Sequence, residues 1–234
     1  MKLRINCPKC IGSGEQTVVK VEPTNDGRFE ATCSAGHHFK TTVGYHDFQI
    51  LFEIGVNAIH DGYYREAVGS IAASYERFLE FFIRIVAKKS EIEASAIDDA
   101  WKAVGKQSER QLGAFVFLYL TSFKEAPKLL PNSRVTFRNE VIHKGKIPDR
   151  ANCIKYGDAV QQSILSVLRK LWATHQREVI SSINDKAFPE GEPMPESFFL
   201  PWMTLPTNRE PTEAGEERDL ESLLEGVAKV REMG

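Results

Sequence analysis

An arginine and a histidine stand five positions apart in the segment FRNEVIHKGK, residues 137–146, and two lysines follow them. A guanidinium can hold two phosphate oxygens at once, and an imidazole gains and loses a proton near neutral pH. Arg138 and His143 therefore carry the groups that cleavage of a phosphodiester needs. The competing interpretation is an ordinary surface helix that ends in cations, which are favoured at a helix C-terminus.

Helical spacing divides this segment into two faces. Asn139 and His143 are four residues apart and share a face, while Phe137 and Val141 occupy roughly the opposite one. The apolar pair can anchor the helix on a core and leave the Asn/His face open to solvent. Arg138 directly precedes Asn139, so its side chain starts at the edge of that face and can reach a group held beside His143.

The charge around this segment is positive. Seven basic residues face two acids, and the local net charge of +5 suits a phosphate backbone. The basic residues are Lys128, Arg134, Arg138, Lys144, Lys146, Arg150 and Lys155, and the acids are Glu140 and Asp149.

A second group of reactive residues lies near the N-terminus. Cys7 and Cys10 form a C-x2-C pair, and Cys33 and His37 form a C-x3-H pair. Two such pairs can supply the four ligands of a tetrahedral zinc ion, and the segment resembles a zinc ribbon. The Gly-His pairing favours His37 over His38 as fourth ligand, and three reduced, metal-free cysteines are the alternative. A closed site of four ligands is structural, so we expect no chemistry at the metal.

The surrounding elements divide the chain into three parts. Residues 1–45 read as a small β module, in which QTVVKVE and RFEATC form strands about the turn PTNDG and HHFKTTVGY adds a third. Residues 46–184 read as five or six helices in a bundle. Residues 185–234 form an irregular tail rich in Pro and Glu, with a short helix at its end. The predicted fold class is mainly α.

Three helical features are specific enough to test. The longest periodic stretch runs from Tyr63 to about Lys89, and a Ser90–Glu93 capping box is expected to start the next helix. SERQLGAFVFLYLTSF is apolar almost all round, which predicts burial within the bundle. The apolar face of the longest helix comprises Ile71, Tyr75, Phe78, Leu79, Phe82 and Val86, and that of the last comprises Leu220, Leu223, Leu224 and Val227.

The overall charge and hydropathy place limits on partners and location. The chain of 234 residues has a net charge of −2, and it contains neither a run of roughly 18 apolar residues nor an apolar leader. We therefore expect a soluble, cytoplasmic protein with no membrane partner. The tail carries −7 and the rest of the chain +5.

The sequence RNEVIH resembles the Arg-(four to six residues)-His signature of HEPN domains, including the polar residue that follows the arginine. The long preceding helix carries SYERFLE with Glu76, as HEPN bundles often do. The resemblance covers roughly residues 47–183. It implies a HEPN-like helical bundle and a homodimer in which two such helices face each other.

The resemblance also implies an activity: metal-independent cleavage of RNA by the ribose 2′-OH, which leaves a 2′,3′-cyclic phosphate. In that reaction His143 is the general acid–base and Arg138 binds the phosphate. Asn139 orients one of these groups, and Glu76 holds them in place. Arg134, Lys144 and Lys146 are candidate RNA-binding residues and are not assigned a catalytic role. A toxin or anti-phage defence role would follow.

One alternative to the nuclease remains open, and control by a nucleotidyltransferase antitoxin is not expected. HEPN-like domains can be catalytically silent and bind RNA or protein, with Arg138 and Glu76 forming a structural ion pair. HEPN toxins silenced by nucleotidylation carry a tyrosine two residues after the histidine, and Gly145 occupies that position here.

The C-terminal tail also has two interpretations. Its apolar strip either completes the core or the dimer interface, or it docks so that the acidic segment 213–225 covers the basic motif and restrains the enzyme until a trigger releases it. The tail is also the expected contact for a regulatory protein partner. The strip comprises Phe198, Phe199, Leu200, Trp202 and Met203.

Overall fold

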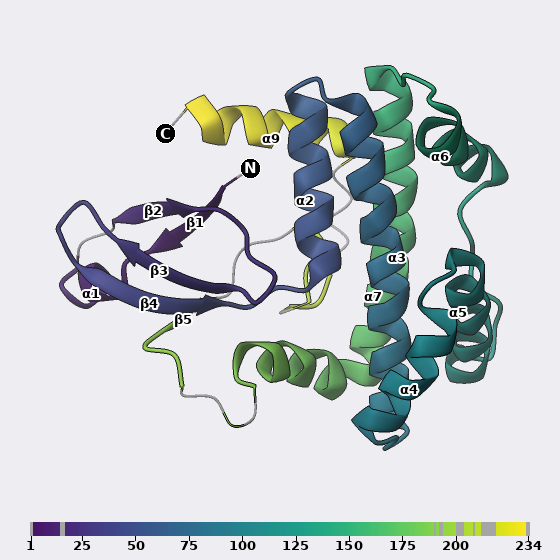
Figure 1. The fold of residues 1–234 in the computed structure, drawn as a ribbon, viewed down its shortest axis with the longest axis horizontal. Helices are drawn as coiled ribbons and strands as arrows, with labels where there is room; N and C mark the ends of the chain where they lie inside the picture. The colour runs from purple at the N-terminus through teal and green to yellow at the C-terminus, as the bar shows by residue number, and fades with distance from the viewer. Residues whose placement is uncertain are drawn as a thin grey trace.

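Two parts of unequal size lie side by side in the computed structural model: small β-sheets at the N-terminus and a larger helical bundle (Figure 1). The structure describes residues 2–14, 17–189, 191, 194–199, 204–207, 209–211 and 219–232. Each part has its own cluster of buried apolar side chains. The predicted class, mainly α with a small β module in front, is confirmed.

The N-terminal part contains two separate antiparallel pairs of strands. Strand β1 (Leu3–Asn6) pairs with β2 (Val18–Val21), and β3 (Arg28–Thr32) pairs with β4 (His38–Val43). A short helix, α1 (Pro8–Gly12), lies between β1 and β2.

The expected hairpin across the PTNDG turn is wrong, because β2 pairs with β1 and not with β3. Leu3 and Ile5 alternate with polar neighbours in β1, so pairing this strand with β2 buries both apolar side chains. Strand β1 was not among the predicted strands. The turn instead carries the chain from one sheet to the other.

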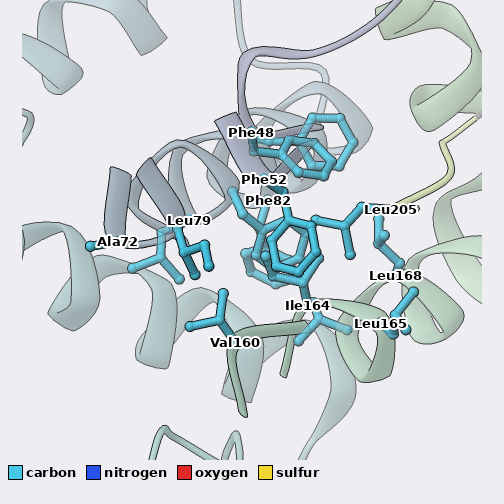
Figure 2. Packing of buried hydrophobic residues seen from close by; sticks show 14 of the residues in the cluster. Phe48, Phe52, Ala72, Leu79, Phe82, Val160, Ile164, Leu165, Leu168 and Leu205 are labelled. Atoms are coloured by element: carbon cyan, nitrogen blue, oxygen red, sulfur yellow. The ribbon is translucent and has the colours of Figure 1, made fainter. Parts of the chain in front are cut away.

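The bundle is built on α2 (Asp47–His60), α3 (Tyr64–Lys89) and α7 (Arg150–Ala187), which pack lengthwise (Figure 1). The predicted apolar face of α3 is buried, with Tyr75 half-buried at its edge. Figure 2 shows Phe52 and Phe82 in one cluster with side chains of α7 such as Ile164. The long helices share one core because their apolar side chains pack closely against one another.

Two of the predicted helix features are corrected. Ser90 ends α3, because its backbone N–H bonds to carbonyls of the last turn, and its hydroxyl bonds to the Val86 carbonyl. Helix α4 (Ala94–Val104) follows Glu93, whose side chain makes no capping bond. No capping box joins Ser90 to Glu93.

Helix α5 (Ser108–Phe123) is not buried all round. Only Gln111, Phe115 and Tyr119 are buried on it, whereas Phe117 is 72% exposed and Leu120 is 43% exposed. A periodic pattern reports amphipathicity but cannot say how many neighbours a helix has, and α5 lies at the edge of the bundle (Figure 1).

Helix α6 (Asn132–Lys144) carries the motif segment and lies on the side of the bundle away from the β-sheets (Figure 1). It ends at Gly145, which has a positive φ of 70°, and the Lys146 N–H bonds back to the Glu140 carbonyl. Asp149 then caps α7 by accepting from the Asn152 N–H. Gly145 and Asp149 thus delimit the two helices through local backbone and side-chain bonds.

The described parts of the tail connect the two cores. Strand β5 (Phe198–Phe199) adds to β4 in parallel, and Leu205 is 1% exposed among bundle residues (Figure 2). Helix α9 (Leu220–Glu232) packs on α2 and α7 with Leu220 and Leu224 buried. These contacts favour a tail that completes the core. Leu200, Trp202, Met203 and residues 212–218 lie outside the described residues.

Among the described helices, none has both the length and the apolar character that crossing a membrane requires.

Candidate functional sites

Cys7, Cys10, Cys33 and His37 converge in the N-terminal part, and we call these four residues the metal cluster. Their potential ligand atoms all lie within 4.8 Å of one another. The Cys10 and Cys33 sulfurs are 3.8 Å apart, and His37 Nδ1 is 3.3 Å from the Cys10 sulfur and 3.9 Å from the Cys7 sulfur. All three cysteines are buried thiols.

These distances fit a tetrahedral metal site. Ligands at about 2.3 Å (sulfur) and about 2.0 Å (nitrogen) from one ion would be about 3.5–3.8 Å from each other. The three separations given above bracket that range, so the four residues are placed to hold one ion. The choice between the neighbouring histidines is also clear, because His38 points outward and its Nε2 lies 2.7 Å from Glu30 Oε1.

Local backbone bonds hold the ligands in place. The Cys33 N–H bonds to the His37 carbonyl, and the Gly36 N–H bonds to the Cys33 carbonyl across a turn in which Gly36 has a φ of 81°. Burial opposes ionisation of the Cys33 thiol, but backbone hydrogen bonds from His37 and Ala35 outweigh it and lower its pKa to about 7. The thiolate is the form that binds a metal.

The second site lies on α6, and we call Glu76, Arg138, Asn139 and His143 the motif site. Arg138 Nη2 donates to Glu76 Oε1 at 2.7 Å, and Arg138 Nη1 donates to Asn139 Oδ1 at 3.0 Å. His143 Nε2 lies 3.5 Å from Arg138 Nη1. Arg138 is thus the centre of the site and contacts each of the other three residues.

The predicted faces of α6 explain this arrangement. Phe137 and Val141 are buried against the bundle, with the Phe137 ring 6.0 Å from that of Tyr156 on α7. His143 is exposed, and Asn139 is half-buried beside it. The anchoring pair holds the helix so that its reactive face borders solvent, while Arg138 reaches across to α3.

The surrounding charge is less positive than the local sequence predicts. Lys146 pairs with Glu140 at 2.7 Å, and Arg150 pairs with Glu221 of α9 at 2.6 Å. Counting Glu76 and Glu221, which lie far away in the sequence, seven basic residues face four acids and the net charge is +3. Of the three predicted RNA-binding residues, Arg134 and Lys144 have no ion-pair partner among the described residues, whereas Lys146 has one.

Tyr156 also belongs to this neighbourhood and was not among the predicted site residues. It is 2% exposed, lies on α7 behind Phe137, and interacts electrostatically with Arg138 and Glu76. Burial raises its pKa above the usual value for tyrosine, so the phenol is neutral. No local pattern in the sequence of α7 distinguishes Tyr156 from an ordinary core aromatic.

A cavity of about 790 Å³ lies elsewhere, between the start of α2, the second half of α3 and the end of α7. Its cations are paired with carboxylates: Arg84 bonds to Glu80 and Asp98, Lys88 pairs with Asp185, and Lys186 pairs with Asp47. This cavity contains none of the residues of the motif site.

Comparison with known proteins adds no assignment: the chain matches no protein-family model, no curated protein and no solved structure at a significant level. The residues and geometry of the two sites are therefore the basis for a functional assignment.

Proposed function

We propose that this protein is a metal-independent endoribonuclease of the HEPN type whose reaction takes place at the motif site. The observation that carries the proposal is the convergence of Arg138 on Asn139, His143 and Glu76 at an exposed helix face. A bidentate cation beside an imidazole can bind a phosphate and move a proton within the same site.

The reaction can be written for these residues. The His143 imidazole takes the proton from a ribose 2′-OH, whose oxygen then bonds to the adjacent phosphorus. Arg138 stabilises the charge that develops on the phosphate oxygens. The bond from phosphorus to the 5′-oxygen breaks, and an imidazolium protonates that oxygen. The products are a 2′,3′-cyclic phosphate and a 5′-OH end, and no metal takes part.

Each supporting residue has a defined role in this proposal. Asn139 accepts from Arg138 and limits the positions that the guanidinium can take. Glu76 holds Arg138 from the neighbouring helix. Arg134, Lys144 and Lys146 surround the site as candidate contacts to the RNA backbone, in the setting of a toxin or of defence against phage.

We further propose a homodimer in which two motif sites face each other. Val135 and Ile147 flank the site and are exposed by 43% and 80%, respectively. Apolar side chains at these positions would be covered by a second copy related by twofold symmetry. Light scattering of the protein and of Val135→Glu at micromolar concentration tests this, and a parent protein that is monomeric and active contradicts it.

For the metal cluster we propose one structural zinc ion per chain. Three thiolates and one imidazole are ligands that zinc prefers, and all four positions are filled by protein. When bound, the ion supplies folding free energy to a part of the chain with a small core. Its chemistry is not needed at the motif site.

The nuclease proposal is tested by incubating purified protein with labelled RNA in EDTA and identifying the ends. His143→Ala and Arg138→Ala should each lower the cleavage rate by about 100-fold or more. His60→Ala is the matched control, since His60 is an exposed helical histidine outside the site. Equal cleavage by the parent and both site variants overturns the proposal.

One observation favours a second candidate function, an RNA-binding or protein-binding module without catalysis. Arg138 is already neutralised by Glu76 at 2.7 Å, as a structural ion pair would be. This alternative predicts RNA binding that depends on Arg138, with no new RNA ends formed under any of these conditions.

A further inference from the structure

The cavity beside the second half of α3, at about 790 Å³, is large enough to hold a small organic molecule. Part of its wall is apolar, with Phe81 and Ile85 from α3, Ile92 from the loop that follows and Ile97 from α4. Ile92 is 48% exposed, so part of this apolar surface is open to solvent. A ligand with an apolar body would remove that surface from water.

Every cation that lines this cavity already has a carboxylate partner. Arg84, Lys88 and Lys186 make the ion pairs given above. The remaining cation is Arg77, whose Nη1 donates to Glu80 Oε2 at 2.6 Å. An anionic ligand would have to displace one of these carboxylates or lie beside it, and either arrangement costs free energy. The paired cations therefore do not favour an anion.

Two carboxylates of the cavity lack such a partner. Glu91 and Glu93 flank Ile92 in the loop between α3 and α4, and both are exposed. Neither carboxylate makes an ion pair or a hydrogen bond with a residue that the structure describes. Five carboxylates and four cations line the cavity, so its net charge is −1, and the two charges without a partner are both negative. Charge complementarity therefore favours a cation.

The local fold gives no reason for a carboxylate at Glu91. Its φ of 56° lies in the left-handed region, where a side chain with a Cβ costs free energy and glycine is preferred. Its N–H bonds to the Lys88 carbonyl at 3.0 Å, and the Ile92 N–H bonds to the Ala87 carbonyl at 3.3 Å, which is a common way to end a helix. Glu93 precedes α4, but its side chain makes no capping bond. Both carboxylates are therefore available to a ligand.

We propose that this cavity binds a small organic cation, an amine whose apolar body packs on Ile92 and Ile97 and whose ammonium group pairs with Glu91 and Glu93. A cation gains carboxylate partners here and displaces none, and its apolar body covers a surface that is open to water. The site is separate from the motif site, so the inference holds whether or not the protein cleaves RNA.

Two probes with the same ring system and opposite charge test the proposal. Tryptamine carries an ammonium group, and indole-3-propionate carries a carboxylate. Titration of the full-length protein with tryptamine should shift the methyl NMR signals of Ile92 and Ile97, while that of Ile11, an exposed isoleucine of the N-terminal part, stays fixed. Indole-3-propionate should bind about tenfold more weakly, because it meets two carboxylates without partners.

Removing either negative charge should weaken the binding of tryptamine. Glu91→Gln and Glu93→Gln should each raise its dissociation constant about threefold, since exposed ion pairs are weak, and the double variant should raise it about tenfold. Glu66→Gln is the matched control, because Glu66 is an exposed carboxylate of α3 that does not line the cavity. It should bind tryptamine as the parent does.

The apolar contact is tested separately. Ile92→Ala should raise the dissociation constant of tryptamine about threefold, because less apolar surface is covered. Leu129→Ala is the matched control: Leu129 is 42% exposed and lies outside the cavity, so its truncation should leave tryptamine binding unchanged.

Glu91→Gly separates a role in binding from a role in the fold. Glycine adopts a positive φ readily, so this variant should have a higher unfolding temperature than the parent. It should nevertheless bind tryptamine about threefold more weakly, as Glu91→Gln does. A lower unfolding temperature for Glu91→Gly, with tryptamine binding unchanged, would make this residue structural and overturn the inference.

Three further results would also overturn it. The first is a parent protein whose Ile92 signal does not move at millimolar tryptamine. The second is binding of indole-3-propionate as tight as that of tryptamine or tighter, which would assign the site to the arginines. The third is a Glu91→Gln, Glu93→Gln double variant that binds tryptamine as tightly as the parent.

Discussion

The metal cluster and the motif site each use a histidine, and the two histidines have opposite surroundings. His37 faces two sulfurs within 3.9 Å in a site closed by four protein ligands. His143 is exposed, and its Nε2 has one neighbour at 3.5 Å. The enclosed His37 can therefore stabilise the fold, whereas the exposed His143 can contact a substrate. In the sequence the two look alike, because each histidine is close to another reactive residue.

The two sites also differ in what holds them. The ligands of the metal cluster come from two turns within one small module, so a bound ion is expected to substitute for a large core. The motif site depends on a bundle that is stable without it, because Phe137 and Val141 fasten α6 to the core. Damage to the first should unfold a region, and damage to the second should remove function alone.

The largest effect is expected from breaking the metal cluster. Cys10→Ser should remove the metal and expose residues 1–45 to protease, because structural zinc contributes about 10–16 kcal/mol to small folds. Elemental analysis should find about one zinc in the parent and none in the variant. Cys153→Ala, a buried cysteine outside the cluster, should keep the metal. An ordered N-terminus in a metal-free parent would contradict this expectation.

The next effect concerns the attachment of the tail. A side chain at Gly157 would clash with Leu220 of α9, so Gly157→Ala should lower the free energy of unfolding by about 1–3 kcal/mol. Gly113→Ala is the matched control, because nothing lies within 4 Å of that position, and it should raise stability by about 0.5–1 kcal/mol. Chemical denaturation measures the free energy of unfolding of both variants. Equal changes in the two would show that Leu220 of α9 does not pack against Gly157.

A smaller effect is expected at the junction between the two regions. Burial, and then Lys186, lower the pKa of His46 to about 3, so this histidine is neutral in the folded protein. The unfolded chain binds a proton at about pH 6.5, which means that stability from His46 is present above that pH and is lost as the pH falls toward 3.

Between pH 7 and pH 5 the loss from His46 should be about 2 kcal/mol. His46→Asn keeps a side-chain acceptor for the start of α2 and should flatten this pH dependence, measured by denaturation of the helical signal. His60→Asn, at an exposed position, should retain the slope of the parent. A parent whose stability is constant over this range would show that the folded protein does not lower the pKa of His46.

The smallest change in stability is expected from breaking the motif site. His143→Ala should alter the free energy of unfolding by no more than about 0.5 kcal/mol, as surface substitutions do. Arg138→Ala should lower it by about 1 kcal/mol, since its ion pair with Glu76 is only partly buried. Chemical denaturation checks both. A loss of several kcal/mol from His143→Ala would make this histidine structural and weaken the contrast between the two sites.

Local chemistry was enough to predict several features of this protein. The spacing of Cys7, Cys10, Cys33 and His37 identified the metal cluster, because ligands within short turns are brought together by the turns themselves. The two faces of α6 also followed from the helical period. These features depend on residues a few positions apart.

The tertiary structure decided the features that depend on distant partners. The pairing of β2 with β1, the exposure of Phe117 on α5 and the packing of Tyr156 against Phe137 follow from which surfaces meet. Glu76 and Arg138 lie 62 residues apart, and their 2.7 Å contact neutralises a cation that the local sequence counts as free. Burial and long-range pairing are properties of the packed chain, because each is set by several elements at once and by no single segment.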